Sequence, residues 1–334
     1  MSETALQKRR SPIVWTLLKI FLALILVWFV FSKTDLDSIL ALRERISVPW
    51  LIVGFGLFFL LTVLKAMQYY VLLGRKVKYP SVLNVVVVQN AVSNFIATGA
   101  GIASYLALFR MEQGVKLGRA TITFLITKVG DLISIWLILL LTSLALWPQI
   151  VLLQGWVILL LVGMGLAIIF FFLAVWLRQG FVGLVERLSK KIHLDRIGIF
   201  RKGLDFLEAL AAQEQRLVFR MVGMGVVYSL MYMLVTMAWV YACLRVFDVH
   251  IPWLVVVFVN DFMQLVSYVP VQIFGGLGVT EVLYLSLYGI LGYAAGELAA
   301  ALLGIRVLFY LMNLSTLIYL PLHTFFLANR NRSE

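Results

Sequence analysis

The feature of this sequence that most restricts its fold is a set of long apolar runs. An α-helix of about 20 residues, rising about 1.5 Å per residue, crosses the roughly 30 Å hydrocarbon core of a bilayer. Six apolar runs have about this length or more, at residues 13–31, 49–73, 120–147, 151–177, 218–246 and 297–327. The chain is 63% hydrophobic and 13% charged, as polytopic membrane proteins are. We therefore predict an all-α integral membrane protein, a polytopic helical bundle with about six full spans.

The same sequence argues against several other classes of protein. It has no nucleotide-binding loop, no dinucleotide fingerprint and no serine-hydrolase elbow, so we predict no enzyme and no cofactor. His193, His250 and His323 are scattered without the spacing of metal ligands, and Cys243 is the single cysteine. We attribute the net charge of +12 to contact with anionic lipid headgroups rather than with nucleic acid.

Two further apolar segments, 81–109 and 253–291, are interrupted by polar residues and glycines. Lipid offers no partner to an unpaired amide or charge, so such a segment needs a protein-lined or wet cavity around it. The second arm of 253–291 has about 13 apolar residues, or roughly 20 Å of helix, which is too short to span. We interpret both segments as re-entrant hairpins with glycine tips at 99–101 and 275–278. Two full crossings per segment are the alternative, because both arrangements place the loops on the same sides.

The loop charges orient the chain. If residues 8–10 lie inside, every basic loop also lies inside, as the positive-inside rule requires. The predicted outer loops, 247–252 and 289–296, contain no Lys or Arg. Both termini are therefore predicted to be cytoplasmic. We interpret the polar linker 178–217 as two amphipathic helices on the inner leaflet, with an ordinary cytoplasmic loop as the alternative.

The two halves of the chain resemble each other. Residues 85–90 are similar to 255–260, and Lys128 corresponds to Arg306 at the offset that also relates Gly118 to Gly296. Each half contains two spans, a hairpin and a span, and the halves begin on opposite sides of the membrane. Transporters use such inverted-topology repeats for alternating access. Within one transmembrane domain, 1–334, we assign 13–147 to the first repeat, and 151–177 with 218–327 to the second.

Two spans carry charges deep in the membrane. Lys128 is followed on the same helical face by Asp131, so a local ion pair is the alternative to ligand binding. Arg306 shares its face with Tyr310 and Asn313 and has no acid within its own helical turn. Arginine at such depth costs about 2.5–3.5 kcal/mol unless it is paired. We expect either a structural salt bridge to another segment or a phosphate or lipid headgroup, which a guanidinium binds in bidentate fashion.

Other charged residues have more local interpretations. The acids available to Arg306 are Asp261 and Glu281. Glu281 is also placed to cap the helix after Gly278, with a role toward a headgroup or proton as the alternative. Lys65 and Arg110 are expected to extend to the inner interface. The candidate headgroup-binding residues are the polar residues and glycines of the hairpins and charged spans: Asn90, Asn94, Lys128, Asp131, Asn260, Asp261, Gln264, Gly275, Gly276, Gly278, Glu281, Arg306, Tyr310 and Asn313.

The pattern Pro270-x4-Gly275-Gly-Leu-Gly278-x-x-Glu281, followed by an apolar arm and a span with Arg306, carries a resemblance. Over about 12–328 the chain resembles the lysylphosphatidylglycerol synthase transmembrane-region family, also called the flippase-like domain family, which includes the membrane half of the multiple peptide resistance factor. The resemblance implies a bacterial or archaeal inner membrane, two related re-entrant subdomains and lipid translocation.

The chain departs from this family's pattern in its first half. The family usually has a proline and a Gly-acid pair before its arginine, whereas residues 97–110 contain neither a proline nor an acid. The third span has Thr127-Lys128 where the family often has Glu-Arg. These changes remove acids that would meet a cationic headgroup, which argues against a lysyl lipid as the substrate. The family's soluble aminoacyl-transferase domain is not in this sequence, so a separate synthase is an expected partner.

We predict a flippase-like transporter that moves a phospholipid or polyprenyl-linked amphiphile between leaflets. The alternative is a membrane-embedded enzyme, or an accessory subunit, acting on a lipid-linked substrate, with Asp261, Glu281 and Tyr268 as candidate groups. A scaffold for a separate synthase is a third interpretation. The expected partners are membrane lipids with anionic headgroups, such a synthase and a second copy of the chain.

Overall fold

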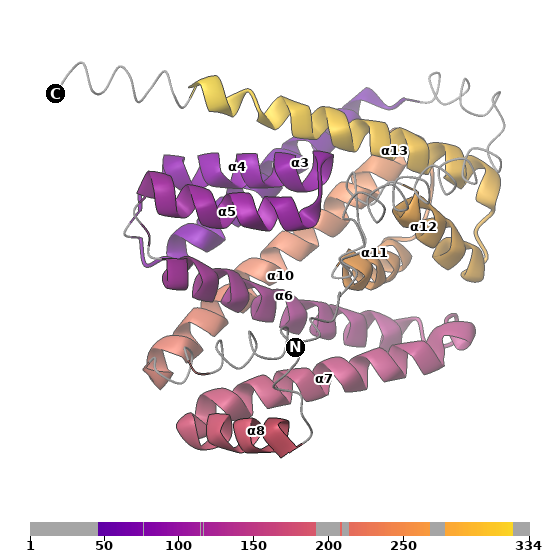
Figure 1. Cartoon of the computed structure of the whole chain (residues 1–334). Coiled ribbons are helices and arrows are strands. Elements are labelled where there is room, and N and C mark those ends of the chain that lie inside the picture. The colour runs from indigo at the N-terminus through magenta and orange to yellow at the C-terminus, as the bar shows by residue number, and fades with distance from the viewer. Residues whose placement is uncertain are drawn as a thin grey trace, which may run out of the picture.

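A computed structural model shows the fold of the chain (Figure 1). It describes residues 46–75, 77–113, 115, 117–191, 208, 214–267 and 278–322. Within these residues every regular element is helical and no strand occurs, which confirms the predicted all-α membrane architecture.

Five described helices are long and apolar enough to cross a bilayer, in agreement with five of the predicted spans. They are α3 (Val48–Leu72), α6 (Leu117–Ala145), α7 (Gln154–Leu177), α10 (Gln215–Val246) and α13 (Ala295–Thr316). A short 3-10 turn, η1 (Val151–Leu153), leads into α7, and the apolar stretch of α13 continues to Leu322. The first predicted span, 13–31, lies outside the described residues.

Four shorter helices occupy the segments of the two predicted hairpins. They are α4 (Tyr79–Phe95) with α5 (Thr98–Gln113), and α11 (Trp253–Ser267) with α12 (Val279–Ile290). The longest of them, α4, has 17 residues. This is about 25 Å of helix, less than the roughly 30 Å of the hydrocarbon core. The lengths fit hairpin arms, and the re-entrant path itself stays a prediction.

The predicted glycine tip of the first hairpin at 99–101 is wrong. The chain turns at Ile96 and Ala97, and both glycines lie in the first turns of α5, which is longer than the arm 102–109 predicted for it. Gly101 serves helix packing instead, because a Cβ atom there would lie 1.7 Å from Ser93 Oγ and 2.9 Å from the Gln89 carbonyl oxygen. Glycine at this position therefore lets α5 approach α4 closely.

Small residues also bring the central spans together. α3 packs along α10, and the Gln68 side chain of α3 donates hydrogen bonds to Ser229 Oγ (2.9 Å) and to the Gly225 carbonyl oxygen (3.2 Å) of α10. α6 crosses α10 at Gly130, where a Cβ atom would lie 2.8 Å from the Gly225 backbone. Without strong hydrophobic driving force between helices in lipid, such close backbone approach supplies packing energy.

The helix packing follows a paired pattern. The first hairpin helix of each half contacts the last span of the other half, α4 on α13 and α11 on α6. α3 contacts α4, α6 and α13, and α10 makes the corresponding contacts with α11, α13 and α6. Within each half, the contacts of α5 with α4 and α6 correspond to those of α12 with α11 and α13. This is the pattern expected of two equivalent halves around a central α3–α10 pair. The opposite membrane orientation of the halves stays a prediction.

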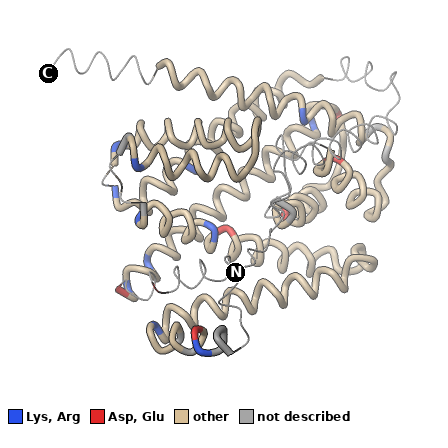
Figure 2. The backbone as a smooth tube through the Cα atoms, viewed as in Figure 1, with Lys and Arg blue, Asp and Glu red and all other residues tan. Residues whose placement is uncertain are grey.

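Basic residues gather at one end of the bundle. Figure 2 shows Lys and Arg mainly at the left-hand ends of the helices, the end predicted to be cytoplasmic. The linker begins there with α8 (Gln179–Lys191), which is one of the two predicted helices and packs on α7. The second predicted linker helix lies outside the described residues, apart from the helical Glu208.

The α6–α10 crossing gives a prediction about stability. Gly130→Ala should destabilise the fold by about 1–3 kcal/mol, because the added methyl group has no room against the Gly225 backbone. Gly223→Ala is a matched control on α10, because a Cβ atom there meets nothing within 4 Å. Thermal unfolding of the purified protein in detergent would compare the two. Equal melting temperatures for both variants would contradict this account of the crossing.

Candidate functional site

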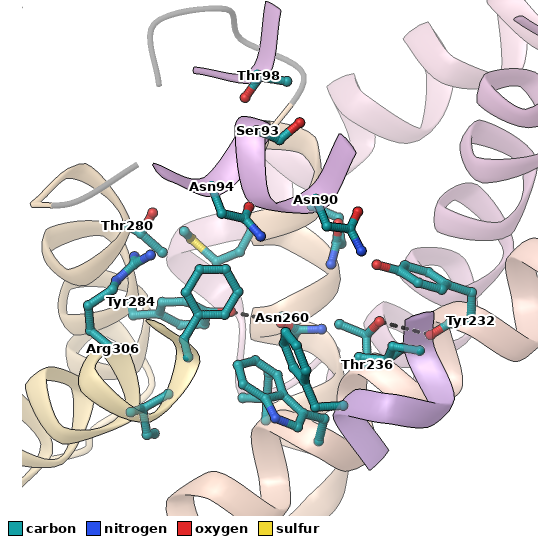
Figure 3. A pocket seen from close by; sticks show the side chains of 18 of the residues that line it. Asn90, Ser93, Asn94, Thr98, Tyr232, Thr236, Asn260, Thr280, Tyr284 and Arg306 are labelled. Atoms are coloured by element: carbon teal, nitrogen blue, oxygen red, sulfur yellow. Dashed lines mark hydrogen bonds between the residues drawn. The ribbon is translucent and has the colours of Figure 1, made fainter. Parts of the chain in front are cut away.

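A cavity of about 400 Å³ is lined by residues of α3, α4, α5, α6, α10, α11, α12 and α13 (Figure 3). Half of the predicted headgroup-binding residues line it, and they come from both halves of the chain. They are Asn90, Asn94, Lys128, Asn260, Gln264, Glu281 and Arg306. Asn90 in the first half corresponds to Asn260 in the second, and Lys128 corresponds to Arg306. The members of both pairs thus line the same cavity.

Arg306 is paired with Glu281. Its Nε and Nη2 atoms both lie 2.5 Å from Glu281 Oε1, and the two side chains are only 11% and 4% exposed. The second carboxylate oxygen, Oε2, accepts a hydrogen bond of 2.6 Å from the backbone N–H of Gly278. Glu281 therefore caps α12 and neutralises Arg306 at once, through different oxygens. Of the two acids considered for Arg306, the structure selects Glu281.

Gly278 is suited to this cap by its backbone. Its φ of +83° lies in the left-handed region that glycine adopts without steric cost. From this position its N–H donates to the carboxylate of Glu281, three residues later, as in a capping box. Gly275 and Gly276, the other glycines of the predicted tip, lie outside the described residues.

A second charged cluster surrounds Asp131 on α6. Its Oδ2 atom lies 3.3 Å from Lys128 Nζ and 3.7 Å from Lys65 Nζ, and its Oδ1 atom accepts a 2.6 Å hydrogen bond from Ser229 Oγ. The local Lys128–Asp131 pair is thus present, but it is part of a larger network. Two ammonium groups face one carboxylate, so the cluster has an excess of positive charge beside the cavity.

The expectation that Lys65 extends to the inner interface is wrong. Its side chain is 14% exposed, and its ammonium group lies 5.6 Å from the ring centre of Tyr69 and 5.0 Å from that of Tyr232. Aromatic faces and Asp131 together stabilise the charge inside the bundle. The position of Lys65 near the end of its span gave the depth of the residue but not the direction of its side chain.

Amide side chains complete the cavity. Asn260 Oδ1 accepts a 2.7 Å hydrogen bond from the Tyr284 hydroxyl, while its Nδ2 is buried without a hydrogen-bond partner among the described residues. Asn94 Nδ2 donates to Asn313 Oδ1 at 2.7 Å and so ties α4 to α13. Asn313 is 1% exposed and does not line the cavity, so its role is to hold the first hairpin against the last span.

Asp261 is buried away from these clusters. It is 0% exposed, does not line the cavity, and neither carboxylate oxygen has a hydrogen-bond partner among the described residues. Val257 and Leu265, one turn before and after it on α11, belong to an apolar cluster with residues of α6, α7 and α10. Asp261 therefore lies on a buried face of α11 and is not part of the Arg306–Glu281 pair.

Aromatic and hydroxyl side chains fill the remaining wall. The Arg306 guanidinium carbon lies 5.6 Å from the ring centre of Phe309, which lines the cavity, and 6.0 Å from that of Tyr310, which does not. Seven lining residues with hydroxyl groups were not predicted from the sequence: Thr62, Ser93, Thr98, Tyr232, Thr236, Thr280 and Tyr284. Single hydroxyl groups in apolar helices are too common to stand out in a sequence. Figure 3 shows several of them grouped around the cavity with Asn90 and Asn260.

The Arg306–Glu281 pair predicts a pattern of stabilities. Glu281→Ala should destabilise the protein by about 3–5 kcal/mol, because it leaves a buried guanidinium without its counter-charge. The double variant Glu281→Leu/Arg306→Met should recover most of this loss, since an apolar replacement of a buried pair is often neutral. Thermal unfolding in detergent measures both. A double variant less stable than the single one would contradict this interpretation.

The two buried aspartates should respond differently to one substitution. Asp131→Asn removes the carboxylate that pairs with Lys65 and Lys128, so we expect a fall in melting temperature. Asp261→Asn removes no hydrogen bond or ion pair among the described residues, so the melting temperature should stay unchanged or rise. Thermal unfolding of the two variants side by side tests this. A larger fall for Asp261→Asn would show that Asp261 has a structural partner.

Comparisons with known proteins bear on these residues. No curated protein and no solved structure matches the chain. The family model described as "Lysylphosphatidylglycerol synthase TM region" matches residues 16–315, from the first apolar run almost to the end of α13. The match covers most of the chain and confirms the resemblance carried by Gly275-Gly-Leu-Gly278-x-x-Glu281. The chain therefore belongs to the lysylphosphatidylglycerol synthase transmembrane-region family.

Proposed function

We propose that this protein is a flippase-like transporter, which moves the headgroup of an anionic phospholipid or polyprenyl-linked amphiphile between membrane leaflets. Membership of a family named for the membrane region of a lipid synthase indicates that the chain acts on lipids. The observation that carries the proposal is the polar cavity inside an apolar bundle, lined from both halves and flanked by excess positive charge.

The size of the cavity fits a headgroup. At about 400 Å³ it is near the small end of ligand pockets, so it holds a phosphate with a small substituent but not a pair of acyl chains. The tails of a bound amphiphile therefore stay in the lipid while the headgroup occupies the cavity. Lys128, with a side chain 41% exposed, and the Nδ2 of Asn260 supply hydrogen-bond donors to the anion.

Glu281 takes a special place in this proposal. Its carboxylate receives hydrogen bonds from a guanidinium and from an N–H at a helix N-terminus, which are the groups that proteins use to bind phosphate. We interpret it as an internal anion that occupies the phosphate position. A headgroup that enters the cavity would replace Glu281 on Arg306, so the guanidinium is never left unpaired in the membrane. The release and return of Glu281 would then accompany each transport cycle.

The enzyme alternative has weaker support. Glu281 is engaged by Gly278 and Arg306, Asp261 does not line the cavity, and Tyr268 lies outside the described residues. The described lining thus offers no free acid to act as a base. We therefore propose a transporter in the bacterial or archaeal inner membrane with both termini inside. A separate synthase as supplier of the lipid, and a second copy of the chain, are part of the same proposal.

Reconstituted vesicles can test this function. We expect wild-type protein to move fluorescent phosphatidylglycerol to the other leaflet, measured by chemical quenching of the outer leaflet. Arg306→Gln/Glu281→Gln should slow this movement at least about tenfold, which corresponds to about 1.4 kcal/mol, by removing the anion site without leaving a buried charge. Arg110→Gln is the control, because Arg110 is exposed and does not line the cavity.

The outcome is decisive in either direction. Folded double variants that move the lipid at the wild-type rate would overturn the proposed transport site. If wild-type vesicles move no lipid and mass spectrometry shows a lipid product missing in cells that lack the protein, the enzyme alternative gains support.

A further inference from the structure

A second cavity lies at the basic end of the bundle, about 980 Å³ in volume, where α3, α6 and α10 meet. It shares no lining residue with the first cavity, which Lys128 and Arg306 line. Its rim carries three arginines from three different elements: Arg75 after α3, Arg119 on α6 and Arg220 on α10. The proposed headgroup transport makes no use of these residues.

The charge of this cavity is of one sign. Among the residues that the structure describes, no acid lines the cavity and none of the three arginines forms an ion pair. Three guanidinium groups around one space repel one another unless an anion lies between them. Guanidinium groups bind phosphate oxygens in bidentate fashion and are weakly hydrated, which suits a phosphate at the edge of the membrane.

The backbone at the rim is shaped around one of these arginines. Arg119 Nη2 donates a 2.7 Å hydrogen bond to the carbonyl oxygen of Leu73, at the end of α3. Gly74 beside it has a φ of +73°, and a Cβ atom there would lie 2.9 Å from the same Nη2. The left-handed backbone therefore favours glycine at this position, and a larger side chain would displace the Arg119 guanidinium. The turn thus holds the Arg119 guanidinium beside the cavity.

The floor of the cavity is apolar. Leu72, Ile126 and Val218 are buried and line it together with Met221 and Met224. A free inorganic anion would gain nothing from such a floor, whereas an acyl chain buries apolar surface against it. The positive-inside rule places this end of the bundle at the cytoplasmic leaflet, where anionic lipids concentrate.

We propose that this cavity is a binding site for an anionic phospholipid of the inner leaflet. The phosphate lies among Arg75, Arg119 and Arg220, and the upper part of an acyl chain lies on the apolar floor. The inference depends on this cavity alone and holds whether or not the protein transports lipid.

The test compares two triple variants that remove equal charge. Arg75→Gln/Arg119→Gln/Arg220→Gln changes the rim, while Arg110→Gln/Arg187→Gln/Arg216→Gln changes exposed arginines that do not line the cavity. Native mass spectrometry of the purified protein in a neutral detergent, titrated with phosphatidylglycerol, counts retained lipids. We expect the rim variant to bind at least about tenfold more weakly and to retain one lipid fewer than the control triple.

Further measurements identify the ligand and separate a loss of binding from a loss of folding. Phosphatidylcholine should bind much more weakly than phosphatidylglycerol, and inorganic phosphate should compete poorly. Competition by inorganic phosphate at similar concentration would show a free-phosphate site and overturn the lipid assignment.

Arg75→Gln/Arg220→Gln keeps the Arg119–Leu73 hydrogen bond and replaces the rim triple if that variant fails to fold. Arg306→Gln/Glu281→Gln should leave this lipid bound, which separates the site from the transport cavity. Equal retention by rim and control variants would overturn the proposal.

Discussion

The carboxylate of Glu281 connects parts of the membrane domain that are distant in the sequence. One oxygen receives two N–H groups of Arg306 on α13, and the other receives the N–H of Gly278 at the start of α12. A guanidinium in hydrocarbon is tolerated only with a counter-charge, and a helix that starts inside the membrane needs its first N–H groups satisfied. A single side chain meets both requirements. The second hairpin and the last span are therefore fixed against each other by electrostatics as well as by the apolar packing of residues such as Leu287 and Leu302.

The first half solves the same problem with other residues. Its counterpart of Arg306, Lys128, lies beside Asp131 on its own helix, and Lys65 of α3 joins the same carboxylate. Here the acid lies within the span, and Ser229 of α10 completes its hydrogen bonding. The first hairpin carries no acid at its turn, and it is held to α13 through the hydrogen bond from Asn94 to Asn313. The cavity thus has two unlike sides, one with a balanced pair and one with an excess positive charge.

Much of the architecture followed from the sequence, because membrane spans are set by length and polarity alone. The bounds of α3, α7 and α10 agree with the predicted runs within a few residues, since lipid demands about 20 apolar residues wherever a helix crosses. The position of the first hairpin turn did not follow. A glycine pair resembles a turn signal, but Gly101 serves close packing against Ser93, and this depends on which helix lies beside it. The direction of Lys65 was missed for a similar reason, because depth in a span says nothing about the face a side chain occupies.

The sequence by itself determined that the chain is an all-helical membrane protein of a known family, with two polar interruptions and a set of intramembrane charges, because each of these properties is local. Only the tertiary structure decided which charges meet. It paired Arg306 with Glu281 rather than with Asp261, placed Asn90 and Asn260 in one cavity, and brought three arginines from separate elements around a second cavity. These choices depend on contacts between residues that are far apart in the sequence, such as Asn94 and Asn313, which are separated by 219 positions. Helix packing sets such contacts, and no pattern within a single helix specifies them.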